Sequence, residues 1–80
     1  DAVADARFDL IVANIVANTI VELLPRVGGY LHSEGFFVAS GIVLERLGEV
    51  REAWEESSLV LVEERRLDDW FCMIGQVRQP

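Results

Sequence analysis

The sequence contains no lysine, one histidine and one cysteine, and each of these shortages excludes a class of chemistry. Without lysine there is neither a Walker-type lysine for nucleotide phosphates nor a lysine for a Schiff base. The single cysteine, Cys72, cannot form an internal disulfide, which fits the reducing environment of the cytoplasm. The single histidine, His32, has no second histidine or cysteine at a metal-ligand spacing, so we expect no metal site.

Long apolar runs and clustered positive charge are also missing. The longest apolar stretch lies around Leu10 to Val12 and has about eight residues, far below the roughly 20 that a membrane helix needs. Seven arginines against 14 acidic residues give a net charge of -7, and the only adjacent basic pair, Arg65-Arg66, directly follows two glutamates. A phosphate-binding surface needs clustered positive charge. We therefore expect neither a membrane nor a nucleic acid as a partner.

What is present suits one small domain. The chain has 80 residues, of which 51% are hydrophobic and 26% are charged. A chain of this length buries only about 60 to 65% of the surface that its unfolded form exposes. We expect residues 1–80 to form a single domain whose core is thin unless a neighbouring part of a larger protein adds to it.

The hydrophobic period changes from strand to helix near the start of the chain. Residues 8–15, from Phe8 to Ile15, are almost continuously apolar, which is typical of a strand in a parallel sheet that is buried on both faces. From Ala17 or Asn18 onward the apolar residues follow one stripe of an amphipathic helix. Pro25 lies inside that stripe, so we expect either a kink or a fresh short helix there. The stripe consists of Ile20, Leu23, Leu24, Val27 and Leu31.

The remaining pattern predicts a strand, a second helix and a hairpin. Residues 32–35 (HSEG) indicate a turn, and residues 36–41 form a strand that completes a parallel crossover unit. A helix with Leu47, Val50 and Trp54 on its apolar face follows. Residues 59–66 and 70–78 are separated by three residues, which requires an antiparallel hairpin. The predicted α/β order is β-α-β-α-β-β, and its two helices are too few to cover both faces of the sheet.

Candidate functional residues lie where the parallel strands end, because ligands of open α/β sheets bind beyond the carboxyl ends of the strands. Asn14 ends the first strand, and Ser40-Gly41 end the second. Asn14 either contacts a ligand or hydrogen-bonds a local turn, and Gly41 either opens the backbone to a ligand or supplies a permissive backbone angle. Trp54, Trp70 and Cys72 are interpreted as packing residues.

The order and spacing of several segments resemble the carboxy-terminal half of the ribosomal protein L-eleven methyltransferases. No single segment is specific, but together they cover residues 7 to about 78. The segments are FDLIVANIVA at residues 8–17, ELLP at residues 22–25, Gly35, SGIV at residues 40–43, Val50, Ala53-Trp54 and Asp69-Trp70.

This resemblance implies strands four to seven of the Rossmann-like sheet of a class I methyltransferase, the carboxy-terminal part of a larger domain. It implies that Asn14 contacts S-adenosylmethionine near its transferable methyl group, and we expect Ser40 and Gly41 to line the substrate channel. The family's glycine-rich loop and ribose-binding acid have no counterpart here, since Gly28-Gly29 lies in a helix-period segment. We therefore expect this chain alone to bind the cofactor weakly or not at all and to be inactive.

Two functions follow from these observations. The resemblance implies that the complete parent enzyme methylates lysine or other amino groups of a ribosomal protein in the cytoplasm. No residue of this chain is predicted to be catalytic, but an asparagine suits the site because its amide oxygen accepts a hydrogen bond from an amine without competing as a nucleophile. The alternative is a non-enzymatic remnant or interaction module that associates with itself through the exposed strand from Phe8 to Ile15.

Overall fold

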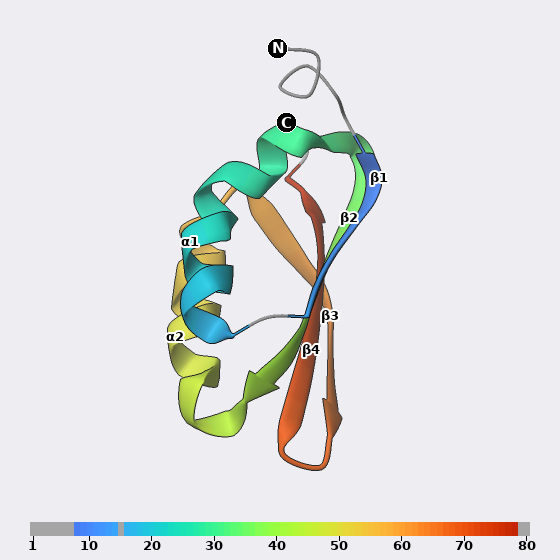
Figure 1. The fold of residues 1–80 in the computed structure, drawn as a ribbon. Helices are drawn as coiled ribbons and strands as arrows, with labels where there is room; N and C mark the ends of the chain where they lie inside the picture. The colour runs from blue at the N-terminus through green and yellow to red at the C-terminus, as the bar shows by residue number, and fades with distance from the viewer. Residues whose placement is uncertain (1–7, 15, 79–80) are drawn as a thin grey trace.

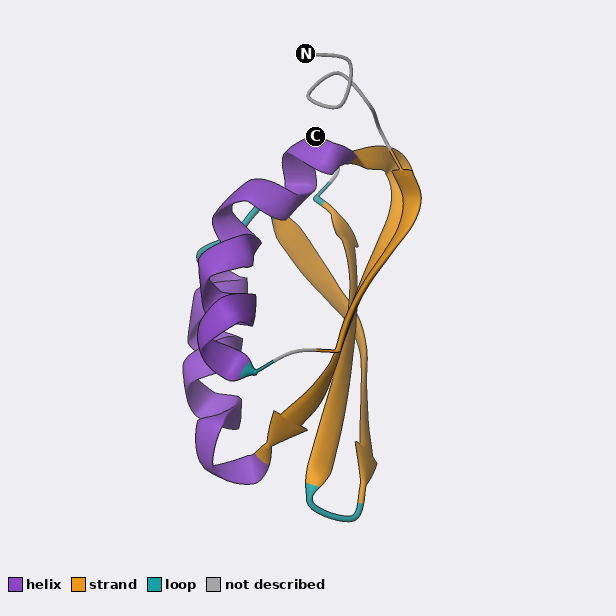
Figure 2. Ribbon diagram, in the orientation of Figure 1, coloured by secondary structure: helices purple, strands orange, loops and turns teal. Residues whose placement is uncertain are grey.

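Four strands form one mixed sheet, and two helices lie on one of its faces in the computed structural model, which describes residues 8–14 and 16–78 (Figures 1 and 2). The predicted order of elements is confirmed. In chain order the elements are β1 (Phe8–Asn14), α1 (Ala17–Val27), the 3-10 turn η1 (Gly28–Tyr30), β2 (Leu31–Val43), α2 (Leu44–Glu55), β3 (Leu59–Leu67) and β4 (Trp70–Val77). Ile15, which was expected to end the first strand, lies outside the described residues.

The strands are arranged in the order β1-β2-β4-β3. Strands β1 and β2 are parallel, whereas β4 is antiparallel to both β2 and β3. The mixed sheet with a parallel side and a hairpin side is therefore as predicted. Strand β4 lies inside the sheet, so β1 and β3 are the two edge strands.

The prediction of a turn at residues 32–35 is wrong, because β2 already begins at Leu31 and runs for 13 residues. Leu31 pairs with Phe8 of β1, and the register of the two strands shifts between Phe8 and Leu10. A Cβ added at Gly35 would lie 2.8 Å from the carbonyl oxygen of Phe8. Gly35 therefore lies where the backbones of β1 and β2 approach closely in an irregular part of the ladder. Glycine is common both at such close approaches and in turns. Leu31 belongs to this strand rather than to the helical stripe.

Pro25 does not begin a fresh helix. It lies inside α1, which continues to Val27 and then tightens into the 3-10 turn from Gly28 to Tyr30. Its missing N–H removes one i→i−4 hydrogen bond, and the helix ends two residues later, so little of the helix lies beyond the proline. The predicted start of the helix at Ala17 is confirmed.

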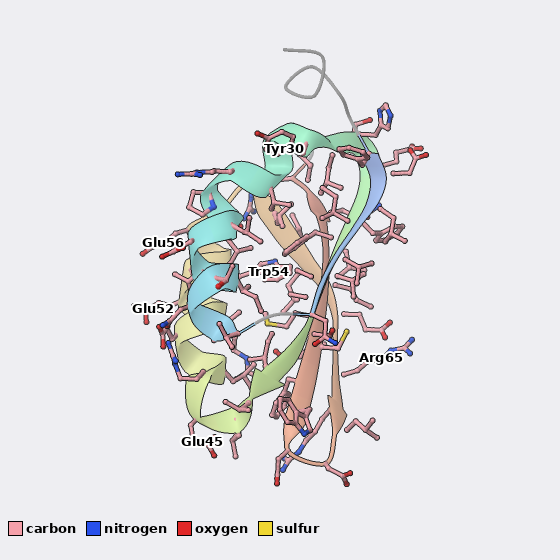
Figure 3. The ribbon with its side chains drawn as sticks, in the orientation of Figure 1. Tyr30, Glu45, Glu52, Trp54, Glu56 and Arg65 are labelled. Atoms are coloured by element: carbon pink, nitrogen blue, oxygen red, sulfur yellow. The ribbon has the colours of Figure 1, made fainter. Side chains whose placement is uncertain are left out.

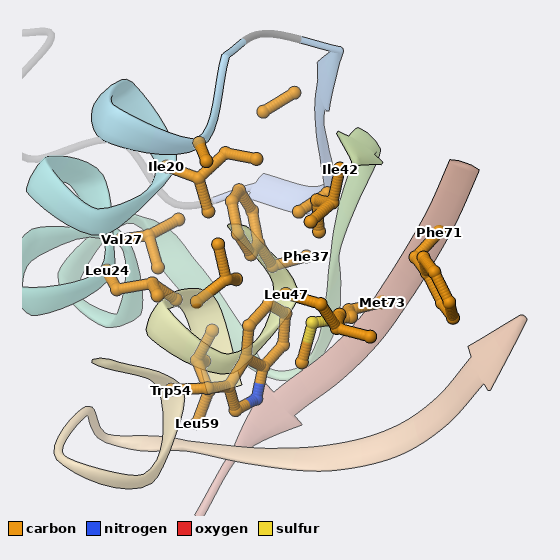
Figure 4. Packing of buried hydrophobic residues seen from close by; sticks show 14 of the residues in the cluster. Ile20, Leu24, Val27, Phe37, Ile42, Leu47, Trp54, Leu59, Phe71 and Met73 are labelled. Atoms are coloured by element: carbon orange, nitrogen blue, oxygen red, sulfur yellow. The ribbon is translucent and has the colours of Figure 1, made fainter. Parts of the chain in front are cut away.

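A single hydrophobic core fills the space between the two helices and the sheet (Figure 4). Trp54 of α2 is buried in it, with its ring 5.8 Å from that of Phe37 on β2. Trp54 also lies directly against Gly75 of β4, where an added Cβ would be 2.5 Å from Cζ2 of the indole. The other large, fully buried side chains of this core are Ile20, Leu24, Ile42, Val50, Leu59 and Met73.

Both helices of the described residues lie on one face of the sheet, so within that part of the chain the opposite face has no helix over it, as the count of helices predicted (Figure 1). Leu10 and Val12 of β1 are 56% and 61% exposed on this face. They pair with Phe36 and Val38 of β2, and Val38 pairs in turn with Ile74 of β4. We call this surface the uncovered face. Strand β1, which was expected to be buried on both sides, buries only Ala13 among its described residues.

An ion pair connects α2 to strand β3. The Arg51 Nε donates a hydrogen bond of 3.0 Å to Glu64 Oε1, and a second guanidinium nitrogen contacts the other carboxylate oxygen. This hydrogen bond holds the pKa of Glu64 below its ordinary value. Neither α1 nor α2 is long and apolar enough to cross a membrane.

Replacing Gly75 by alanine should destabilise the protein, because the new methyl group would collide with the Trp54 indole and the Val60 carbonyl oxygen. Overpacking of this kind costs about 1 to 3 kcal/mol. Gly48 is the matched control, since it lies on the exposed side of α2 with nothing within 4 Å. Gly48→Ala should stabilise the protein by about 0.5 to 1 kcal/mol. Urea denaturation of both variants measures the two effects, and equal stabilities would contradict this packing.

Replacing Glu64 by glutamine should lower stability at pH 7 and have no effect in acid. Because Arg51 lowers the folded-state pKa of Glu64, the pair stabilises fully above the unfolded pKa, and the contribution disappears as the pH falls through the folded pKa. The loss at neutral pH should be at most about 1 kcal/mol, as for other exposed pairs. Glu52→Gln, on the outer side of α2 (Figure 3), is the control and should change little at either pH. A pH-independent loss for Glu64→Gln would refute the ion-pair explanation.

Candidate functional site

The parallel pairing of β1 and β2 brings the predicted site residues together. Asn14, the last residue of β1, pairs in register with Ser40 of β2, and Gly41 follows directly. Ala13 points into the core and is buried, so the next residue, Asn14, points to the uncovered face, where it is exposed. Strand β2 continues to Val43, so Ser40 and Gly41, predicted to end it, lie inside the strand. The carboxyl end of β1 therefore meets β2 shortly before the end of β2, at the end of the parallel pair where ligands of open α/β folds bind.

Gly41 adopts a backbone conformation that side chains rarely permit. Its φ angle is +80°, and the register between β2 and β4 shifts between Ala39 and Ile42, so a β-bulge lies here. A Cβ at Gly41 would lie 2.6 Å from Asn14 Oδ1. The interpretation of Gly41 as a residue with a permissive backbone angle is confirmed. Within the described part of the chain the Asn14 side chain makes no hydrogen bond, so the interpretation that it hydrogen-bonds a local turn has no support there.

A pocket of about 410 Å³ lies between this bulge and the β3–β4 hairpin. Apart from Ser40 and two arginines its lining residues are mostly apolar, and they include no acid and no histidine. The pocket is lined by Ser40, Gly41, Arg65, Arg66, Leu67, Trp70, Phe71 and Cys72. Ser40 and Gly41 thus line a concave surface, and Asn14 lies beside Gly41.

The two arginines of this pocket are partly engaged by their neighbours. Arg66 lies 5.4 Å from the ring centre of Phe71, and its Nε donates a 2.8 Å hydrogen bond to the Asp68 carbonyl oxygen. Arg65 forms an ion pair with Glu63, whose hydrogen bond raises the pKa of Arg65. Arg65 projects on the side of the sheet opposite the helices (Figure 3). Both residues bring positive charge to the edge of an otherwise acidic chain.

Sequence reasoning missed the hairpin side of this pocket. Trp70 was interpreted only as a packing residue, yet it is 53% exposed beside the β2 bulge. Cys72 is half-buried at the same place, so its interpretation as a packed thiol is only partly correct. The missing signal was the pairing of β2 with β4, which places Trp70 opposite Val43 at the carboxyl end of β2.

The other predicted features lie away from this edge. His32 is 3.9 Å from Asp9 at the opposite end of the parallel pair, and both side chains are exposed. The described residues contain no group of three or more potential metal-ligating side chains. Gly28 and Gly29 follow α1 in a 3-10 turn that leads into a strand, so they do not occupy the strand-to-helix position of a phosphate-binding loop.

A second pocket, of about 470 Å³, lies between β1 and α1. Its lining includes Phe8, at the amino end of β1, and Tyr30, but not Asn14 at the carboxyl end of β1. Ligands of open α/β sheets bind at the carboxyl ends of the strands, so this apolar pocket is not the site that the fold indicates. It marks the open edge of the sheet beside β1.

Comparisons with known proteins identify the family. The family model described as ribosomal protein L11 methyltransferase (PrmA) matches residues 1–78. The ribosomal protein L11 methyltransferase of Symbiobacterium thermophilum is 43% identical over 75 residues, which are 94% of this chain and 25% of that protein. Its counterpart from Ruminiclostridium cellulolyticum is 38% identical over 68 residues, 85% of this chain and 22% of that protein. The chain therefore spans about a quarter of the length of these curated relatives.

Solved structures agree with this assignment. A ribosomal protein L11 methylase from Lactobacillus delbrueckii subsp. bulgaricus superposes with a TM-score of 0.87 at 31% identity, covering 98% of this chain and 40% of that one. The M1.HpyAVI–SAM complex superposes with a TM-score of 0.71 at 13% identity, covering 91% of this chain and 46% of that one, which shows a shared fold only. The fold is thus half of a Rossmann-like methyltransferase sheet, and the chain belongs to the ribosomal protein L11 methyltransferase family.

Proposed function

We propose that this chain is the carboxy-terminal part of a larger methyltransferase domain that uses S-adenosylmethionine to methylate lysine or other amino groups of a ribosomal protein. The observation that carries the proposal is the meeting of Asn14, at the carboxyl end of β1, with Ser40-Gly41 near the carboxyl end of the parallel strand β2. Family membership supports the reaction class. Because the acceptor is a ribosomal protein, the cytoplasm is the proposed place of action.

The proposed role of Asn14 is to orient the amine that receives the methyl group. Its amide is exposed and makes no hydrogen bond to another described residue, so its oxygen is free to accept one from a substrate amine. An amide oxygen orients the lone pair of the amine without competing as a nucleophile, and orientation of this kind contributes much of an enzymatic rate. S-adenosylmethionine, when bound, supplies an activated methyl group next to this position.

Ser40 and Gly41 are proposed to line the channel through which the acceptor side chain approaches. They form one wall of the 410 Å³ pocket beside Asn14. The opposite wall is the β3–β4 hairpin with Trp70, whose exposed ring offers an apolar surface for the aliphatic part of an acceptor. These residues shape and orient the acceptor and take no part in proton transfer.

The chain by itself supplies only one side of such a site. Its glycines do not form a phosphate-binding loop, and its uncovered face and the open edge of β1 lack the neighbours that a complete sheet would provide. A cofactor at Asn14 would be exposed to water on most of its surface, whereas small-molecule sites usually bury most of their ligand. We therefore propose that activity requires the rest of the parent protein.

Isothermal titration of the 80-residue chain with S-adenosylmethionine should show no saturable binding below about 1 mM, because only Asn14 would contact the cofactor.

In the complete protein, Asn14→Ala should lower kcat/KM by about 100-fold or more, the size seen when one positioning group is lost. Asn18→Ala is the matched control, since Asn18 faces Arg46 of α2 rather than the site. Micromolar binding by the chain alone, or equal losses for the two variants, would overturn this assignment.

A second candidate function is self-association through β1, and the asymmetry of the two sheet edges favours it. Edge strand β3 carries four charged residues in a row, at positions 63–66, which is a common protection against edge pairing. Edge strand β1 instead exposes Phe8, Leu10 and Val12, with Asp9 as its only charged residue. An unprotected apolar edge of this kind is able to pair with a second copy.

Sedimentation velocity of the 80-residue chain at rising concentration should therefore reveal dimers or larger species. Leu10→Lys should shift the chain toward monomer, because a lysine blocks an edge strand. Leu67→Lys, at a residue that is 76% exposed on the other edge strand, is the control and should leave association unchanged. A chain that stays monomeric at high concentration would rule out this candidate.

A further inference from the structure

The contact between Gly41 and Asn14 suggests a role for Gly41 different from that of a channel wall. A Cβ built at Gly41 would lie 2.6 Å from Asn14 Oδ1 and 3.9 Å from Asn14 Cγ. Among the described residues, no other atom outside its chain neighbours lies within 4 Å of that position. The space that a side chain would need at Gly41 is therefore occupied by the carboxamide of Asn14.

The backbone angle is a first reason for glycine at this position, since a side chain at a φ of +80° would be strained, but it does not exclude every other residue. Asp68, in the hairpin turn, also has a positive φ of 55° and carries a full side chain. Asparagine and aspartate tolerate such angles, although at some cost. A second reason is steric: only glycine lets the Asn14 oxygen stay where it lies, since any Cβ at residue 41 would be 2.6 Å from it.

No hydrogen bond to another described residue orients the Asn14 amide, so steric contacts such as the one with Gly41 set its position. Its side chain is exposed on the uncovered face and makes no hydrogen bond to another described residue. Strand pairing fixes its backbone against Ser40, which leaves the side-chain torsions to be set by the surface that they meet. Gly41 forms part of that surface.

We propose that Gly41 is a positioning residue, which seats the Asn14 carboxamide against its bare Cα in the orientation needed to bind substrate. The claim that this orientation serves substrate binding rests on the proposed function. The contact between Gly41 and Asn14 does not depend on it. A methyl group at residue 41 would force the Asn14 oxygen to move by several tenths of an ångström or more, and a displacement of about 1 Å can cost about 100-fold in rate.

A double-mutant cycle on the 80-residue chain tests the contact without any ligand. Gly41→Ala introduces both backbone strain and the collision with Asn14, whereas in an Asn14→Ala background only the strain remains. The fall in the urea midpoint caused by Gly41→Ala should therefore be measurably smaller when residue 14 is alanine. Equal falls in the two backgrounds would overturn the proposal. Gly29→Ala, with nothing within 4 Å and no positive φ, should give the same small change in both backgrounds.

Gly41→Asn provides a second variant in case Gly41→Ala does not fold. Asparagine tolerates the positive φ but still adds a Cβ, so its effect should also depend on residue 14. The side-chain amide signals of Asn14 in a proton–nitrogen correlation spectrum should shift in Gly41→Asn and stay in place in Gly29→Ala. Unmoved Asn14 signals would contradict the proposed seating.

Kinetics of the complete protein separate a positioning role from a channel role. If Gly41 acts through Asn14, Gly41→Ala should lower kcat about 10-fold or more with little change in the KM of the acceptor, and it should cause no further loss in an Asn14→Ala background. A channel wall would instead raise the acceptor KM and give additive losses, which would overturn the proposal. If Asn14→Ala leaves activity unchanged while the stability cycle still shows coupling, the proposed function of Asn14 fails and the contact stands.

Discussion

The parallel pairing of β1 with β2 is the constraint on which the rest of the structure depends. Two parallel strands cannot be joined by a tight turn, so the chain between them must cross over the sheet as α1. Such crossovers have one preferred hand, which decides the face that the helix covers. The same pairing carries Asn14 to Ser40, so one element of topology produces both the core and the site.

The core illustrates how far one covered face supports a chain of this size. Both helices contribute their apolar stripes to the same layer, with Ile20 and Leu24 from α1 and Val50 and Trp54 from α2. No polar or charged side chain is buried among the described residues. Among the described residues, Trp54 Nε1 is the one buried side-chain donor that has no hydrogen-bond partner. Packing and backbone pairing therefore account for the stability of this layer, and the surface ion pairs add little.

Much of the fold was predictable because hydrophobic period separates strands from helices well. The period of α1 and the three-residue gap before Trp70 led directly to the correct elements. The prediction that failed, the turn at residues 32–35, depended on a residue type that has two structural uses. Residues 32–35 have the composition of a turn, yet Gly35 permits two strands to approach closely, and sequence composition does not distinguish these uses of glycine.

The site was predictable only in part, for a related reason. Asn14 and Ser40 could be placed together because parallel strands end at the same edge. The approach of Trp70 and Arg66 depends on β4 pairing with β2, a non-local choice that no short loop dictates. The angle at Gly41 depends on a bulge that exists only once this pairing has formed.

The difference between the two edge strands determines at which side a further strand can be added to the sheet. The edge at β3 is charged and ends the hydrogen-bonded ladder, whereas the edge at β1 is apolar and leaves backbone groups available. A sheet with these edges can be lengthened from one side only. A strand that completes the sheet, whether from another part of the same protein or from a second molecule, therefore pairs with β1. Its register must match that of β1, which ends at Asn14.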